Sequence, residues 1–174
     1  MSKSLLGAVI LLSFAVGFFS HYYSKKNTKT FDAIAIKDIT TLPFTSHENK
    51  PLFLNEFQFH DKLIINFWAT WCEPCKEELP ELNNLHKQLT NNQEIKIIGV
   101  AIDEADAVSE FIKKIPVNYP ILVSEPNGFK LGKQLGNDKG VLPYTVIVDT
   151  SYNVLNKFYG KIKLEDLTKV IKSD

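Results

Sequence analysis

The sequence contains two cysteines, Cys72 and Cys75, and only two residues separate them. They lie in Trp71-Cys72-Glu73-Pro74-Cys75, between a continuous apolar run and a segment with helical periodicity. A thiol at a helix N-terminus meets free backbone N–H groups and the positive end of the helix dipole, which lower its pKa. We therefore expect Cys72 to be an attacking nucleophile and Cys75, one turn into the helix, to resolve a mixed disulfide.

The sequence disfavours three other functions of the cysteine pair. A zinc site needs further ligands, but no second cysteine pair exists and the four histidines lack ligand spacing. A purely structural disulfide across so short a loop would constrain little chain entropy. A peroxidase of the peroxiredoxin type would place its threonine one residue further from the nucleophile than Thr70 lies from Cys72. The sequence thus predicts a redox-active pair, no metal and no organic cofactor.

The elements that must hold this pair alternate between strand and helix. Leu63–Trp68 is a continuous apolar run typical of a buried strand, and the leucines from Leu79 to Leu89 recur at helical spacing. Further strands are expected at Ile95–Ile102, Pro120–Val123, Tyr144–Asp149 and Val154–Tyr159, helices at Glu104–Ile115 and Leu164–Ile171, and an N-terminal hairpin from Ile34–Ile39 and Pro51–Leu54. This alternation predicts an α/β sheet with helices on both faces.

Composition excludes two broad classes of protein. The hydrophobic content of 44% is too high for a disordered chain. Twenty basic and twenty acidic residues balance, whereas a general nucleic-acid binder needs a basic surface. Every basic residue is a lysine, so bidentate guanidinium recognition of phosphate or carboxylate is excluded.

The N-terminus carries an apolar stretch, residues 5–23, of about the ~20 residues that cross a bilayer. We expect residues 1–30 to be a membrane anchor with a short tether, and residues 31–174 to be the globular domain. A cleaved signal peptide is the alternative, but its small-residue site at Ala15-Val16-Gly17 lies inside the apolar run. Lys25, Lys26 and Lys29 follow the span, so the positive-inside rule alone disfavours export of the domain.

The stretch from Asn66 to Pro80, NFWATWCEPCKEELP, resembles the active-site segment of the TlpA/ResA group of membrane-anchored thioredoxin-like proteins, and the resemblance covers roughly residues 34–172. It implies a thioredoxin-like fold, with a central mixed sheet flanked by helices and an N-terminal β-hairpin, preceded by one transmembrane helix. It also implies that Pro143 is a cis-proline facing the cysteines. Client contacts are then expected at Pro143, Leu142 and Trp71, with Trp68 in the core.

The same resemblance assigns a proton carrier. Cytoplasmic thioredoxins carry a buried aspartate where this chain has Asn66, which cannot titrate. ResA-like proteins carry a glutamate at the position of Glu78, and the helical spacing places Glu78 on the face of Cys75. Glu78 is therefore expected to accept the proton of Cys75, although a solvated glutamate is the alternative. Asp103, Asp106 and Asp149 lie on different elements and are interpreted as caps and surface charges, not as an acid–base pair.

Together these features predict a thiol–disulfide oxidoreductase on the cytoplasmic membrane, with its catalytic domain on the periplasmic or extracytoplasmic side. The resemblance implies a protein disulfide reductase whose clients are apocytochrome c or copper-site proteins and whose electrons come from a membrane thiol donor. A dedicated cytochrome c maturation thioredoxin is one alternative, but the Pro-Glu pair typical of that subgroup is missing from Gly140–Thr145. A membrane-anchored binding module with an incidental disulfide is the other.

Overall fold

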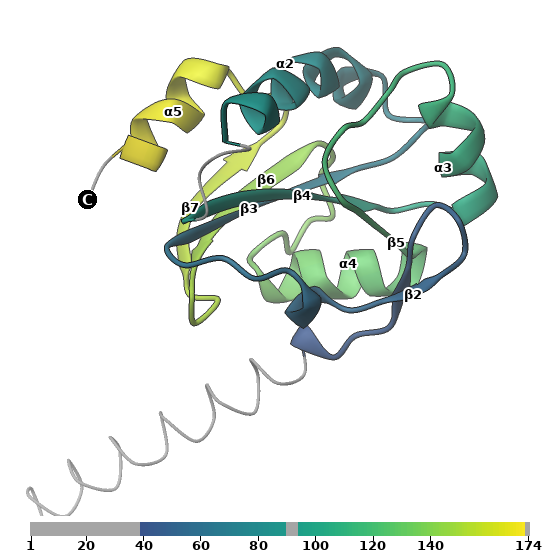
Figure 1. The fold of residues 1–174 in the computed structure, drawn as a ribbon, viewed down its shortest axis with the longest axis horizontal. Helices are drawn as coiled ribbons and strands as arrows, with labels where there is room; N and C mark the ends of the chain where they lie inside the picture. The colour runs from purple at the N-terminus through teal and green to yellow at the C-terminus, as the bar shows by residue number, and fades with distance from the viewer. Residues whose placement is uncertain (1–38, 90–93, 173–174) are drawn as a thin grey trace, which may run out of the picture. The chain divides into compact units, whose positions relative to one another are not determined.

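A computed structural model describes residues 39–89 and 94–172 of the chain. These residues form one seven-stranded sheet with helices against both faces (Figure 1). The strands are β1 (Phe44–Thr45), β2 (Pro51–Leu52), β3 (Lys62–Trp68), β4 (Ile95–Ala101), β5 (Ile121–Val123), β6 (Tyr144–Asp149) and β7 (Val154–Tyr159). Their order is β2-β1-β5-β4-β3-β6-β7. β3, β4 and β5 run parallel, while the other neighbours pair antiparallel, so the sheet is mixed as expected.

Helices cover the sheet from two sides, which confirms the predicted layers. They are α2 (Glu73–Leu89), α3 (Ala105–Ile112), α4 (Glu125–Gln134) and α5 (Leu164–Lys172), with a short 3-10 turn η1 (Leu54–Glu56). In Figure 1, α2 and α5 lie on one face of the sheet and α4 on the other. Leu79 of α2 and Leu167 of α5 belong to one buried cluster, and Leu131 of α4 belongs to the second.

Side chains of β3 alternate between these two clusters. Leu63 and Ile65 pack on the α4 side, whereas Ile64 and Trp68 pack on the α2 side. Both faces are covered, and this is why the strand reads as a continuous apolar run. Strand residues two apart share a face. The polar Asn66 therefore sits on the α2 side, beneath the helix that follows the cysteines.

Helix α4 has no counterpart among the helices expected from the sequence. Its segment is polar and holds two glycines, which weaken a helical pattern. The Oγ of Ser124 accepts from the Asn127 N–H at 3.4 Å and caps the helix. A Cβ on Gly128 would lie 2.8 Å from Cγ1 of Ile102, so glycine lets this helix approach the sheet. Tertiary packing here outweighs local helix propensity.

The N-terminal hairpin uses a different first strand from the one expected. Phe44–Thr45 pairs with Pro51–Leu52, whereas Ile39 lies in a helix and Ile34–Asp38 fall outside the described residues. A tight turn joins the two strands, and in it the Ser46 N–H donates to the Lys50 carbonyl at 2.7 Å. The two strands are too short for period-two alternation to mark them.

The expected membrane anchor, residues 5–23, and the expected boundary near residue 30 lie outside the described residues. Within the part that the structure describes, no helix combines the length and apolar character needed to span a bilayer.

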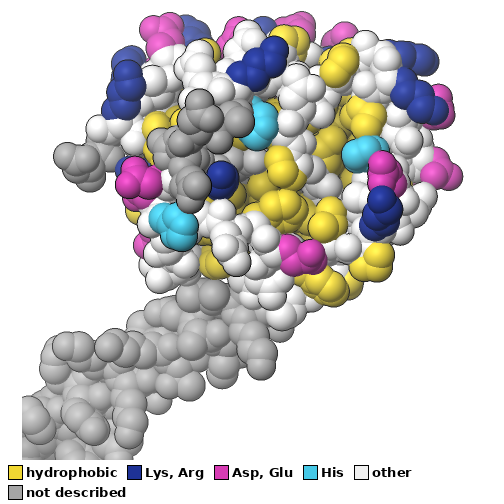
Figure 2. All heavy atoms as spheres, viewed as in Figure 1, with side chains coloured by type: hydrophobic (Ala, Val, Ile, Leu, Met, Phe, Trp, Pro, Cys, Tyr) yellow, Lys and Arg dark blue, Asp and Glu magenta, His cyan; other side chains and the backbone are white. Residues whose placement is uncertain are grey.

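Figure 2 shows that one face of the described fold gathers hydrophobic side chains in its middle, with lysine and acidic side chains around the margin. The large apolar side chains that are exposed on the described fold are Phe53, Trp71, Phe129, Val154, Leu155 and Tyr159. Trp71 is the most exposed of them at 65%, and it adjoins the cysteine pair. Its exposure is compatible with the client contact expected for it.

Candidate active site

A disulfide joins Cys72 and Cys75, with an Sγ–Sγ distance of 2.01 Å and a Cα–Cα distance of 5.3 Å. The carbonyl of Cys72 accepts from the N–H groups of Cys75 at 3.1 Å and Lys76 at 3.3 Å. Cys72 is therefore the N-cap residue of α2, at the positive end of the helix dipole. Cys72 keeps 5% exposure while Cys75 has none, so a reaction partner can reach only the first sulfur.

Pro143 follows a cis peptide bond from Leu142, as the resemblance implies. It stands directly before β6, whose first residue Tyr144 pairs antiparallel with Phe67 of β3. The start of β6 therefore lies beside the end of β3, from which the chain enters the cysteine loop. The sheet thus brings Pro143 and the cysteine loop to the same edge, although many residues separate them in the sequence.

Glu78 is fully buried one turn along α2 from Cys75, so it is not a solvated helix residue. Its Oε1 accepts from Asn66 Nδ2 at 2.8 Å, and its Oε2 accepts from the Ile162 N–H at 3.0 Å. Burial raises the pKa of Glu78 to about 7, because desolvation outweighs the two hydrogen bonds and the charge of Lys161, which oppose it. A carboxyl with this pKa can exchange a proton near neutral pH.

Asn66 extends this buried network to the neighbouring strand. Its Nδ2 also donates to the Thr145 hydroxyl at 3.0 Å, and Asn66 and Thr145 are partners in the β3–β6 register. Both donor hydrogens of the amide are used, while its Oδ1 is buried without a partner among the described residues. Asn66 thus acts as a donor toward Glu78. Sequence reasoning recognised that Asn66 cannot titrate but not this contact.

Asp103 caps a backbone segment outside its own loop. Its Oδ2 accepts from both the backbone N–H of Thr70 at 3.0 Å and the Thr70 hydroxyl at 2.6 Å. Thr70 lies two residues before Cys72, so Asp103 ties the cysteine loop to the end of β4. Asp149, in contrast, caps its own turn by accepting from the Ser151 and Asn153 N–H groups, as expected.

The two tryptophans differ in environment, as the sequence analysis expected. Trp68 is fully buried and packs against Phe111, with ring centroids 5.3 Å apart. The Trp68 ring N–H and the Tyr119 hydroxyl have no hydrogen-bond partner among the described residues. A Cβ on Gly99 would lie 2.9 Å from Trp68 Nε1 and 3.0 Å from Tyr119 Cε2. Both rings therefore pack closely against this glycine of β4.

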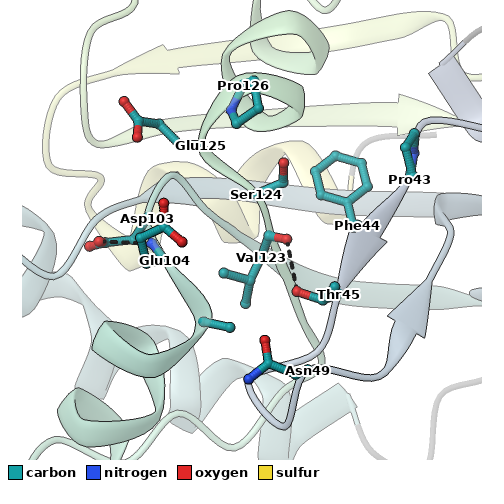
Figure 3. A pocket seen from close by; sticks show the side chains of 11 residues that line it. Pro43, Phe44, Thr45, Asn49, Asp103, Glu104, Val123, Ser124, Glu125 and Pro126 are labelled. Carbon is teal, nitrogen blue, oxygen red and sulfur yellow. Dashed lines mark hydrogen bonds between the residues drawn. The ribbon is translucent and has the colours of Figure 1, made fainter.

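A cavity of about 310 Å³ opens where β4 and β5 end (Figure 3). Asp103, Glu104 and Glu125 contribute carboxylates to its lining, and no lysine lines it. Asp103 lines this cavity and also accepts the hydrogen bonds from Thr70, so the cavity and the cysteine loop adjoin at Asp103. Within residues 39–89 and 94–172, no three His, Cys, Asp or Glu side chains gather as a possible metal site.

Comparison with known proteins agrees with this geometry. The chain is 28% identical to the thiol-disulfide oxidoreductase ResA of Bacillus cereus, over 94% of this chain and 91% of that protein. A thioredoxin-related protein from Neisseria meningitidis serogroup B superposes with a TM-score of 0.65 at 30% identity, covering 74% of this chain and 96% of that one. StoA from Bacillus subtilis shares the fold, with a TM-score of 0.60 at 20% identity.

The fold, the disulfide at the start of α2 and these similarities define the class: a thioredoxin-like thiol–disulfide oxidoreductase of the ResA type. The family model described as Redoxin matches residues 16–171. The chain therefore belongs to the Redoxin family.

Proposed function

We propose that this protein reduces disulfide bonds of client proteins, with Cys72 as nucleophile, Cys75 as resolving thiol and Glu78 as proton acceptor. The observation that carries the proposal is the full burial of Glu78 one turn beyond Cys75, with a pKa raised to about 7 by desolvation. A buried carboxyl at this place is costly for stability. A role in moving the proton of Cys75 explains why it is there.

The first chemical step is an exchange at Cys72. Its thiolate attacks one sulfur of the client disulfide, the client S–S bond breaks, and one client sulfur leaves as a thiolate that takes a proton from water. The positive end of the α2 dipole stabilises the Cys72 thiolate. Trp71, Leu142 and Pro143 provide the contacts that hold the client chain beside the mixed disulfide.

The second step releases the client. Cys75 gives its proton to Glu78, and the resulting thiolate attacks Cys72 Sγ. The Cys72–Cys75 bond forms, the mixed disulfide breaks, and the second client sulfur leaves as a thiolate. The client has then gained two electrons and the protein has lost two. A membrane thiol donor returns them by reducing the Cys72–Cys75 disulfide.

We further propose that residues 5–23 anchor the chain in the cytoplasmic membrane and that the domain works on the extracytoplasmic side. The uncharged apolar stretch supports an anchor. The absence of any cysteine besides the reactive pair supports an oxidising compartment. Apocytochrome c and copper-site proteins are the proposed clients, because covalent haem attachment and copper binding both require reduced thiols in such a compartment.

Insulin reduction in the presence of a small dithiol tests the enzymatic proposal. Cys72→Ser should abolish turnover, and Cys75→Ser should retain a client as a mixed disulfide that a reductant releases. The Glu78→Gln variant should slow turnover, most strongly near neutral pH. Undiminished turnover in Cys72→Ser would refute the proposal, whereas a binding module would retain its partners in both cysteine variants.

Labelling of intact cells with a membrane-impermeant maleimide tests the compartment. Direct labelling of Cys72, the cysteine that keeps some exposure, is the expected result for an exported domain that is held reduced. Labelling that appears only after a reductant is added would place the domain outside but oxidised, which contradicts the proposed reductase direction. Labelling only after lysis would contradict the proposed compartment.

A further inference from the structure

The segment Gly160–Ile162, which links β7 to α5, touches both halves of the active site. The Gly160 N–H donates to the carbonyl of Pro143 at 2.9 Å. Two residues later the Ile162 N–H donates to Oε2 of Glu78 at 3.0 Å, in a buried contact. One short backbone segment, here called the strap, therefore connects the proline loop to the buried carboxyl.

The backbone of Gly160 has a left-handed conformation, with φ of 79°. A Cβ built at this position meets nothing within 4 Å. Lack of space therefore does not explain the glycine, whereas the positive φ does, because L-residues with a Cβ disfavour this region. A substitution here tests backbone conformation, because the added Cβ itself meets no neighbour.

Several charged or titratable groups act on Glu78. Lys161 of the strap lowers its pKa, and Glu81 of α2 raises it. Burial raises the pKa of the Tyr119 hydroxyl, before β5, and Glu78 raises it further; Cys75 lies one turn away from Glu78 on α2. Among the influences that oppose burial, the hydrogen bond from Ile162 is the largest. The position of the Ile162 N–H therefore lowers the pKa of Glu78 more than the charge of Lys161 does.

We propose that Gly160 is a positioning residue for Glu78: its left-handed backbone turns the strap so that the Ile162 N–H reaches the carboxylate while the Gly160 N–H stays on Pro143. This inference rests on the function proposed above, because the proton held by Glu78 matters only if Cys75 delivers it. The proline loop and the proton acceptor are thereby connected through one backbone segment.

The test is a carboxyl-carbon NMR titration of Glu78 in the full chain with its disulfide intact, assigned by comparison with Glu78→Gln. Gly160→Val, which resists a positive φ, should raise the pKa of Glu78 by about one unit, a tenfold higher proton affinity. Gly160→Asn is the matched control, because asparagine tolerates this conformation, and it should keep the original titration. Equal titrations in Gly160→Val and Gly160→Asn would overturn the proposal.

A second comparison separates backbone geometry from charge. Lys161→Gln removes the lysine that pairs with Glu77 at 2.9 Å, and its effect on Glu78 should fade in high salt. The shift in Gly160→Val should persist in salt, since it comes from a buried hydrogen bond. A shift that disappeared in salt would overturn the proposal. Gly160→Ala replaces Gly160→Val if the valine variant does not fold, with a smaller shift in the same direction expected.

These measurements stay informative if the proposed function fails. The titration uses the oxidised protein, so it requires neither client nor turnover. Loss of the proposed function would appear as unaltered insulin reduction in Cys72→Ser, whereas loss of the positioning role would appear as an unaltered Glu78 titration in Gly160→Val. In an active enzyme, the pH profile of insulin reduction should shift upward in Gly160→Val together with the Glu78 pKa.

Discussion

The backbone N–H of Ile162 donates to Oε2 of Glu78 at 3.0 Å, although 84 residues separate the two. Ile162 stands between β7 and α5, while Glu78 lies inside α2. The contact supplies a hydrogen-bond donor to a carboxyl that has lost its water. A buried carboxylate with only two N–H donors remains poorly stabilised compared with one in water, which is the reason for its raised pKa.

We predict that Glu78 makes the stability of the oxidised protein fall as pH rises. The unfolded carboxyl titrates at the ordinary value of 4.5, whereas the folded one holds its proton up to about 7. Unfolding therefore releases a proton between these values, and the free energy of unfolding should fall by roughly 3 kcal/mol across them. Urea unfolding at several pH values measures this slope. Glu78→Gln should abolish it, whereas Glu77→Gln, at an exposed neighbour, should retain it.

Removal of the Asn66 donor should raise the pKa of Glu78 further. Asn66→Leu deletes the hydrogen bond to Oε1 and leaves the Ile162 contact, so we expect an increase of about one unit. NMR titration of the Glu78 carboxyl carbon measures it. Asn83→Leu is the control, because Asn83 is also buried but bonds to the Pro116 carbonyl and the Asn118 N–H. That variant should lose stability without moving Glu78, and an equal shift in both would contradict the prediction.

The contact between Asp103 and Thr70 should stabilise the cysteine loop. Asp103→Ala leaves the Thr70 N–H without its acceptor and should lower the free energy of unfolding by about 1–3 kcal/mol. A double-mutant cycle with Thr70→Val isolates the hydroxyl contact. Asp106→Ala removes the exposed contact with Asn49 and should change stability by less than about 0.5 kcal/mol. Additive effects of Asp103→Ala and Thr70→Val would show that the hydroxyl contact contributes nothing.

The two buried glycines of α4 should respond oppositely to alanine. A Cβ at Gly128 lies 2.8 Å from Cγ1 of Ile102, so Gly128→Ala should cost about 1–3 kcal/mol through overpacking. A Cβ at Gly132 lies at an ordinary 3.5 Å from Phe67 Cε1, so Gly132→Ala should gain up to about 1 kcal/mol of helix propensity. Thermal and urea unfolding of both variants measure the difference. A stabilised Gly128→Ala would mean that α4 does not pack as closely as the structure has it.

The cysteine pair at a strand-to-helix junction and most of the sheet are predictable from the sequence alone. Local signals suffice for these features, because a strand covered on both faces must be apolar along its length. The runs at Leu63–Trp68, Ile95–Ile102 and Tyr144–Asp149 accordingly match β3, β4 and β6 within a residue at each end. The spacing of Glu78 from Cys75 was also readable, since one helical turn is a local distance.

The contacts that surround the cysteine pair and the sheet depend on the tertiary structure. Helix α4 is not predicted from the sequence, because the close approach of the Ile102 side chain requires glycine at position 128 and glycine lowers the helix propensity of the segment. The first strand of the hairpin also pairs with β5, and Thr70 donates to Asp103, so both contacts depend on segments distant in the sequence. Glu78 could have been a solvated glutamate until Asn66 and Ile162 were placed against it. Its proton affinity depends on desolvation and on donors from elsewhere in the chain, and neither is encoded in the spacing of neighbouring residues.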